Sequence, residues 1–312
     1  MGAVLAVALP VFGLILTGAV AGRARFLGDD ATRVLNLFVV YLALPAVLVQ
    51  AMAHIRPRDL ASPGLLLAYG AGVLVPFILA LLVARRGRTR LGDAALQALS
   101  ATYANVGYMG IPLCLTAFGE ASVVPGVITM VITACPQFAL AVTLIELDRQ
   151  QQPQLGRMLA RVGGALARNP LLIAPVVGIA IAASGQALPV AFDRFLSLLA
   201  GAATPCALVA TGMMIAETGE RFRIGQVAWL TTLKLLVQPA ITWAIAFHLV
   251  RLPSGWAETA LVMSALPTGT GAFILAKLYG REAASTSGTV LVSTVLSFFT
   301  LSALLAWTAA RG

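Results

Sequence analysis

The chain has 312 residues, of which 59% are hydrophobic and 11% charged, and its formal net charge is +9. So few charged side chains cannot coat a water-soluble globule of this size, which excludes a soluble fold. The basic residues stand in short clusters between apolar runs rather than on one continuous patch, so we expect no nucleic-acid partner. Membrane lipid is the expected surrounding of the chain.

Apolar runs of about 20 residues, the length that crosses a hydrocarbon core of about 30 Å, recur along the whole sequence. They predict an all-α polytopic membrane protein with ten transmembrane helices, at residues 2–22, 32–53, 64–84, 92–118, 122–147, 170–184, 191–216, 225–250, 256–279 and 283–309. The one long connection, residues 148–169, has apolar residues at helical spacing. It predicts a cytoplasmic linker with a short amphipathic helix on the inner membrane surface.

Basic residues are unevenly divided between the two sides of this topology. The odd-numbered connections carry fifteen lysines and arginines, and the other connections with the C-terminus carry five. By the positive-inside rule, both termini lie outside the cytoplasm. Arginine outnumbers lysine 19 to 2 and alanine is abundant, as in proteins encoded by GC-rich bacterial genomes, so we expect a multi-pass protein of a bacterial inner membrane.

The two halves of the chain repeat the same pattern of helix-bending residues at an offset of 160 to 165 positions. The matching pairs are Pro10 and Pro175, Pro45 and Pro205, Pro76 and Pro239, and Gly110 and Gly271. Because each half, residues 1–147 and 170–312, has five spans, the second half enters the membrane in the opposite sense. Inverted repeats of this kind are typical of secondary transporters, which bind their substrate near the membrane midplane at broken helices.

The fourth and ninth helices carry the breaks. The fourth has two glycines and a proline beside a polar residue, and the ninth has the densest small and polar run of any apolar segment. These residues are Asn105, Gly107, Gly110 and Pro112 in the fourth helix and Pro267, Thr268, Gly269, Thr270 and Gly271 in the ninth. We expect the two unwound segments to cross at the middle of the membrane.

Such a break creates two kinds of helix end. The N-terminal ends present unpaired N–H groups and partial positive charge, which suit a carboxylate, whereas the freed carbonyls need water, a cation or a donor side chain. Asn105 has both a donor and an acceptor and can serve either end.

Lys234 is the basic residue placed well inside an apolar span, where a charge is costly. One interpretation makes it a counter-charge for the freed carbonyls or a ligand of the substrate. In the other interpretation, the Lys234 side chain extends toward the cytoplasmic surface.

These motifs resemble the auxin efflux carrier family, which spans plant auxin exporters and bacterial permeases for malate, malonate and other organic acids. The resemblance rests on the Asn-x-Gly-x-x-Gly-x-Pro run from Asn105 to Pro112, on Lys234 with Pro239, on the Pro267 break and on Tyr279-Gly280. It implies a scaffold of helices 1, 2, 6 and 7 and a transport domain of helices 3–5 and 8–10 that moves like an elevator. Thr268 and Thr270 stand where the family pattern leads us to expect an Asn, and auxin itself is not implied.

The expected partner is a small organic acid bound at the crossover. The predicted substrate-binding residues are Tyr103, Asn105, Gly107, Gly110, Lys234, Pro267, Thr268, Gly269 and Thr270, and the predicted crossover and hinge residues are Pro45, Pro112, Pro205, Pro267 and Gly271. Coupling to a proton or to sodium is left open, as is a homodimer.

The matched broken helices argue against a scaffold or receptor without transport, and two further function classes compete with the organic-acid permease. A sodium-coupled organic-anion carrier of the bile-acid type would share the ten-helix inverted architecture. An intramembrane enzyme is not expected, because the sequence has no H-E-x-x-H motif and no paired intramembrane aspartates, and its three cysteines lie in apolar segments without ligand spacing. We therefore expect neither a cofactor nor a metal.

Overall fold

The computed structural model describes residues 2–25, 27–28, 30–54, 62–149, 164, 168, 170–185, 188–216 and 222–310. Helices make up nearly all of these residues. The described part of the chain contains no strand, and its one β-type pairing is an isolated antiparallel bridge between Ala104 and Thr268. The amphipathic helix expected in the linker falls almost entirely outside the described residues.

The helices of the first half lie within a few residues of the expected ranges. They are α1 (Gly2–Ala24), α2 (Ala31–Phe38), η1 (Val39–Ala43), α3 (Leu44–Ala53), α4 (Pro63–Arg86), α5 (Leu91–Ser100), η3 (Val106–Gly110), α6 (Ile111–Phe118), η4 (Glu120–Ser122), α7 (Val123–Ile132), η5 (Thr133–Gln137) and α8 (Phe138–Arg149). In the fourth expected helix, α5 and η3 are separated by an unwound stretch, residues 101–105.

The helices of the second half also lie within a few residues of the expected ranges. They are α10 (Pro170–Ser184), α11 (Val190–Gly201), α12 (Ala203–Ala216), α13 (Ile224–Thr232), η6 (Leu233–Val237), α14 (Gln238–Trp243), η7 (Ala244–Leu249), α15 (Ser254–Ala265), α16 (Thr270–Tyr279) and α17 (Ala283–Ala309). The ninth expected helix is interrupted between α15 and α16, at residues 266–269.

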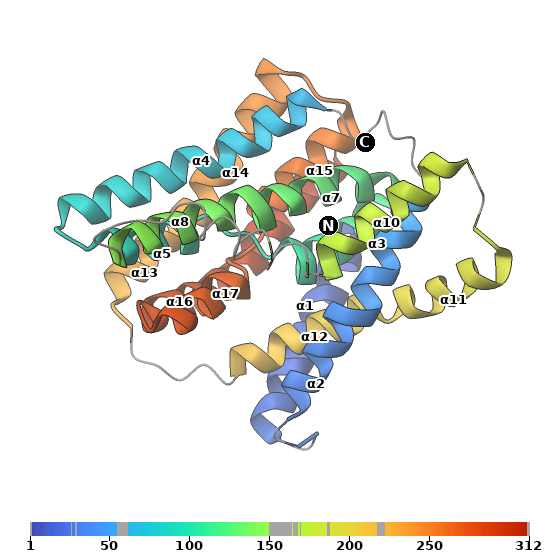
Figure 1. The fold of residues 1–312 in the computed structure, drawn as a ribbon, viewed down its shortest axis with the longest axis horizontal. Coiled ribbons are helices and arrows are strands. Elements are labelled where there is room, and N and C mark those ends of the chain that lie inside the picture. The colour runs from blue at the N-terminus through green and yellow to red at the C-terminus, as the bar shows by residue number, and fades with distance from the viewer. Residues whose placement is uncertain are drawn as a thin grey trace.

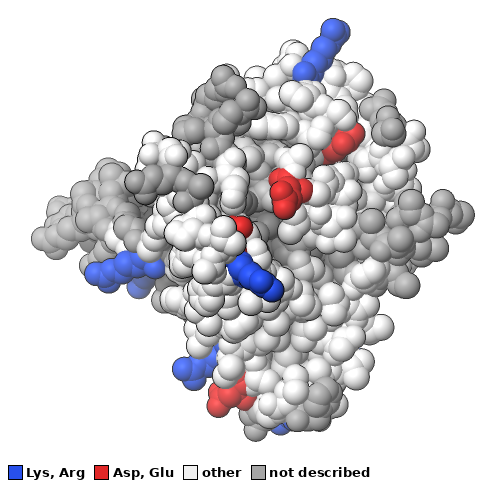
Figure 2. Space-filling model, turned by 90° about the vertical axis from the view of Figure 1, so that its right-hand side faces the viewer, with Lys and Arg blue, Asp and Glu red and all other residues white. Residues whose placement is uncertain are grey.

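Six of the described helical segments are long and apolar enough to cross a membrane: Ala31–Gln50, Pro63–Arg86, Glu120–Arg149, Val190–Met214, Ile224–Leu249 and Ala284–Ala309. Shorter apolar helices cover Phe12–Ala24, Val106–Phe118 and Ile173–Ser184. Many large apolar side chains point outward, among them Leu66, Leu74 and Ile78 of α4. Charged side chains are few and separate on the face that Figure 2 shows. These surfaces suit a hydrocarbon solvent.

Several helices contain a wide π-type turn beside a proline. η1 runs directly into α3, whose second residue is Pro45, and η3 runs into α6, whose second residue is Pro112. η6 likewise runs into α14, whose second residue is Pro239. Proline lacks an N–H and its ring clashes with the carbonyl four residues earlier, so the helix relaxes locally into a wider turn. Pro45 and Pro112 were among the predicted hinge residues, but the sequence did not predict that the bends would take the form of π-type turns.

The helices form two groups that lie side by side (Figure 1). One group contains α1, α2, α3, α10, α11 and α12, and the other contains α4 to α8 and α13 to α17. Within the first group α1 packs along α12, and α3 packs along α10. Each of these contacts joins a helix of the first half to a helix of the second.

Two glycines permit the close approach of α1 to α12. A methyl group on Gly18 would collide with the backbone carbonyl of Val209, and one on Gly212 would collide with the carbonyl of Ile15. Small residues at such positions let two backbones pack directly, which is the main source of helix association in lipid.

We predict that Gly18→Ala destabilises the protein by about 1–3 kcal/mol, because the added methyl group forces two packed backbones apart. Gly13→Ala is the matched control on the same helix, since a methyl group there meets no atom within 4 Å. Thermal unfolding of the detergent-purified variants measures the difference. Equal unfolding temperatures would show that α1 and α12 can separate without cost.

Candidate functional site

The two helix breaks meet and satisfy each other's backbone. The N–H of Asn105 donates to the carbonyl of Pro267 at 2.9 Å, and the N–H of Gly269 donates to the carbonyl of Tyr103 at 2.7 Å. Ala104 and Thr268 form the antiparallel bridge between these two bonds. Unpaired N–H and C=O groups are costly in hydrocarbon, so each break supplies what the other lacks.

A carbonyl at the end of each half-helix before a break is also bonded to a side chain. The Thr268 hydroxyl donates to the carbonyl of Ser100, the last residue of α5, at 2.8 Å. The Lys234 ammonium donates to the carbonyl of Ser264, near the end of α15, at 2.7 Å. A hydroxyl therefore caps one helix end and a cation the other.

Lys234 is fully buried, with 0% of its surface exposed. Its ammonium group lies at the end of α15, against a carbonyl, rather than at the membrane surface. Among the described residues no carboxylate lies within ion-pair distance of it. The partial negative charge of the α15 C-terminus is its electrostatic partner in the described part of the chain.

Further polar side chains hold the crossover in place. Gln137 of η5 donates to the Thr102 hydroxyl at 2.8 Å, and the N–H of Thr268 donates to the Ser293 hydroxyl of α17 at 3.0 Å. Neither Gln137 nor Ser293 was among the residues predicted for the site from the sequence.

A small closed cavity lies beside the crossover, at the start of α16. Its volume is about 20 Å³, which is room for about one water molecule. The lining residues are Asn105, Thr211, Met214, Thr270, Phe273, Ser287, Val290 and Thr294. Of the predicted substrate-binding residues, Asn105 and Thr270 therefore line this cavity, and helices of both groups contribute to its wall.

Four of the cavity's polar and sulfur-containing residues were missed from sequence: Thr211, Met214, Ser287 and Thr294. A signal for two of them was present. Ser287, Val290 and Thr294 stand at helical spacing, so the two hydroxyls share one face of a helix that also carries many other serines and threonines. Thr211 and Met214 lie on α12, in the other helix group, and carry no such local signal.

The other predicted residues shape the crossover from outside the cavity wall. The ring of Tyr103 packs over Gly271, where a side chain would collide with it, and lies 6.0 Å from the ring of Phe138. Gly110 leaves space that the side chains of Met263 and Leu266 fill. Gly107, Pro112, Pro45 and Pro205 do not line the cavity either, and the bends at Pro45 and Pro112 fall in π-type turns.

An ion-pair cluster ties together the ends of α5 and α8 and the turn after α16. The Arg281 guanidinium donates to Asp148 and lies 3.7 Å from Asp93, and Asp148 also accepts from the N–H of Leu91 at 3.1 Å. The hydrogen bond to Asp148 raises the pKa of Arg281 above its usual value. The half-helices that lead into and out of the crossover are thus fixed to each other at their far ends.

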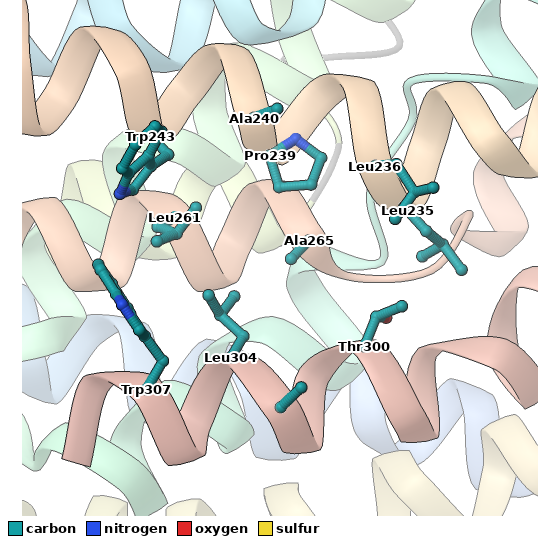
Figure 3. A pocket seen from close by; sticks show the side chains of 11 residues that line it. Leu235, Leu236, Pro239, Ala240, Trp243, Leu261, Ala265, Thr300, Leu304 and Trp307 are labelled. Atoms are coloured by element: carbon teal, nitrogen blue, oxygen red, sulfur yellow. The ribbon is translucent and has the colours of Figure 1, made fainter. Parts of the chain in front are cut away.

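A larger groove of about 450 Å³ lies between α14, α15 and α17. Figure 3 shows Trp243 and Trp307 at one end of this groove and Thr300 toward the other, with leucine, alanine and proline side chains between them. Leu236 and Trp243 are more than a third exposed at the molecular surface. None of the described residues that line the groove is charged, so the groove does not suit an anion.

Comparison with known proteins extends over nearly the whole chain. The family described as "Membrane transport protein" matches residues 3–305. A protein of Rhizobium meliloti (strain 1021) named "Putative malonate transporter" is 27% identical over 98% of this chain and 96% of its own length. The "Uncharacterized transporter YfdV" of Escherichia coli (strain K12) is 24% identical over 93% of this chain and 92% of its own length.

A third relative, the "Lysosomal cholesterol signaling protein" of Mus musculus, is 25% identical over 93% of this chain but only 36% of its own length. The matched family and these relatives agree with the resemblance to the auxin efflux carriers that the crossover motifs and Lys234 indicated. The chain is a multi-pass membrane protein that belongs to the membrane transport protein family, the family of the auxin efflux carriers.

Proposed function

We propose that the chain is a secondary transporter that carries a small organic anion, a carboxylate, across the membrane through the helix crossover. The observation that carries this proposal is the closed cavity at the crossover, lined by Asn105 and by Thr270 at the first turn of α16. The first N–H groups of a helix have no partner inside it and carry partial positive charge, which favours a carboxylate.

Malonate or a similar short dicarboxylate is the substrate class to test first, because a relative of nearly equal length bears that name. Such an anion is larger than the closed cavity, whose volume is about 20 Å³. Transport therefore requires the walls of the cavity to separate. The wall formed by α12 belongs to one helix group, and the crossover belongs to the other.

The proposed mechanism is an elevator-type displacement within a ten-helix fold of two inverted five-helix repeats. In this proposal α1, α2, α3 and α10 to α12 form the scaffold, and the remaining helices form the transport domain that carries the crossover. The pairings of α1 with α12 and of α3 with α10 support it, because exchanging the two halves of the chain converts one pairing into the other.

Asn105→Ala should reduce uptake of labelled malonate by proteoliposomes to about a tenth or less, because it removes the amide that lines the cavity at the crossover. The variant should still fold, since the bond that fixes this residue to Pro267 comes from its backbone N–H. Size-exclusion chromatography and thermal unfolding check this point.

Thr116→Val is the matched control for Asn105→Ala. Thr116 lies on α6, in the half-helix that follows Asn105, is exposed, and donates its hydroxyl to the carbonyl of Pro112. Its uptake should remain close to wild type. If Asn105→Ala took up malonate at the wild-type rate, the substrate site would have to lie elsewhere.

Sodium-coupled transport of the bile-acid type is the competing function. A sodium ion at the crossover would need several convergent oxygens, among them the freed carbonyls of a helix end. The carbonyl of Ser264 already accepts a bond from the ammonium of Lys234. We therefore propose that Lys234 takes the place of a cation at this end, and that uptake continues when sodium is replaced by choline.

Lys234→Gln should lower the initial uptake rate by about tenfold or create a requirement for sodium, because an amide dipole cannot offset the charge of a helix end in a low-dielectric site. Lys234→Arg keeps the charge and is the matched control. Initial rates in proteoliposomes, with and without sodium and at two pH values, measure both effects. Lys234→Gln with wild-type rate, affinity and ion dependence would refute the counter-charge role.

Both termini should face away from the cytoplasm, because the odd-numbered connections carry most of the basic residues. Fusions of a periplasm-active and a cytoplasm-active reporter to the C-terminus measure its location in a bacterial host. A cytoplasmic C-terminus would overturn the proposed topology and, with it, the inverted sense of the two repeats.

A further inference from the structure

A groove separate from the one between α14, α15 and α17 adjoins the closed cavity. It has a volume of about 420 Å³ and is lined by Thr32, Arg33, Asn36, Leu37, Val40, Tyr41, Tyr108 and Met214. We call it the Arg33 groove. It lies between α2 and η1 of one helix group and Tyr108 of η3 in the other. It therefore follows the boundary along which the closed cavity would have to open.

Met214 lines both the Arg33 groove and the closed cavity, so this side chain stands between them. The crossover segment also reaches both spaces, since Asn105 lines the cavity and Tyr108, three residues later, lines the groove. Met214 and the segment from Asn105 to Tyr108 are thus the parts of the chain that the two spaces have in common. A methionine is a flexible side chain that changes rotamer at low cost.

The polar groups of the Arg33 groove fit an anion. Arg33 is exposed, and no described carboxylate lies within ion-pair distance of it. A guanidinium can bind a carboxylate with two parallel bonds. An organic acid in the groove would supply the negative charge that Arg33 lacks.

Another cavity lies at the far end of the continuous helix formed by α2, η1 and α3, and its charged lining residues are acidic rather than basic. It has a volume of about 690 Å³, and its lining includes His54, just past the end of α3, and the carboxylates of Glu120 and Asp193. No lysine or arginine of the described residues lines it, and it shares no lining residue with the closed cavity. We call it the Asp193 cavity. Its carboxylates repel an anion, whereas Arg33 attracts one.

We propose that the Arg33 groove is the route by which an organic anion reaches the crossover, with Arg33 as its first binding group and Met214 as the barrier to the closed cavity. This inference rests on the proposed function. It adds a residue that sets affinity without touching the crossover, and it assigns the access route to one side of the membrane.

The first test is kinetic. An impermeant thiol reagent applied to Arg33→Cys identifies which vesicles, inside-out or right-side-out, expose the groove, and malonate uptake is measured in that preparation. Arg33→Gln should raise KM about fivefold and leave kcat within about twofold of wild type, because the charge is lost before the crossover is reached. The rise should shrink in high salt, which screens the wild-type attraction.

Two controls separate charge from position. Arg33→Lys should keep KM within about twofold of wild type. Arg23→Gln removes the same charge from the end of α1, outside the lining of the groove, and should leave KM unchanged. Equal KM values for Arg33→Gln and Arg23→Gln, with active wild type, would overturn the access route while the proposed function stands. A wild type that transports no organic anion overturns both.

The second test maps the barrier. Met214→Cys should react with the impermeant reagent in the same vesicles as Arg33→Cys, and malonate should slow the reaction. Ala121→Cys, which lines the Asp193 cavity, should react in the opposite vesicles. Wild type, with its three free cysteines, gives the background. Reaction of Met214→Cys only in the vesicles that label Ala121→Cys would refute the assignment of Met214 to the Arg33 route.

Discussion

The structure depends on one constraint, which is that backbone groups freed inside a membrane must find partners there. The two unwound segments meet this constraint by pairing with each other, through the bond from Asn105 to Pro267 and the bond from Gly269 to Tyr103. Neither break would be stable alone. The crossover is therefore a cooperative unit, and its position fixes where the starts of η3 and α16 can offer N–H groups to a ligand.

The two C-terminal helix ends at the crossover are treated differently, and the difference bears on ion coupling. The end of α5 receives a neutral hydroxyl from Thr268, whereas the end of α15 receives the ammonium of Lys234. A cation that is part of the chain is not released together with the substrate. The proposed carrier therefore needs no sodium ion to neutralise α15, and the energy of an ion gradient would have to enter through another group.

The sequence predicted the helices and their breaks, because prolines, glycines and apolar run lengths act locally. It also predicted that Asn105 and Thr270 would lie near each other, since each belongs to one of the two helix breaks that were expected to cross. It did not predict the partner of Lys234. The bond to Ser264 joins residues 30 positions apart on two helices, and no spacing rule selects that carbonyl. Thr211 and Met214 were missed for the same reason, because their role comes from packing between the two helix groups.

Packing also indicates which parts can move. α1 and α12 meet backbone to backbone at Gly18 and Gly212, and α10 meets α3 in the same way at Gly178. Sliding one of these helices past its partner would drive backbone atoms into each other, so the first helix group is expected to act as a rigid frame. Flexible side chains such as Met214 and Phe273 fill the boundary at the closed cavity. Among the described residues, no backbone hydrogen bond joins the crossover to the first helix group. A displacement of one against the other would therefore leave the backbone pairing of the crossover intact, and the Arg281 cluster would hold its half-helices together.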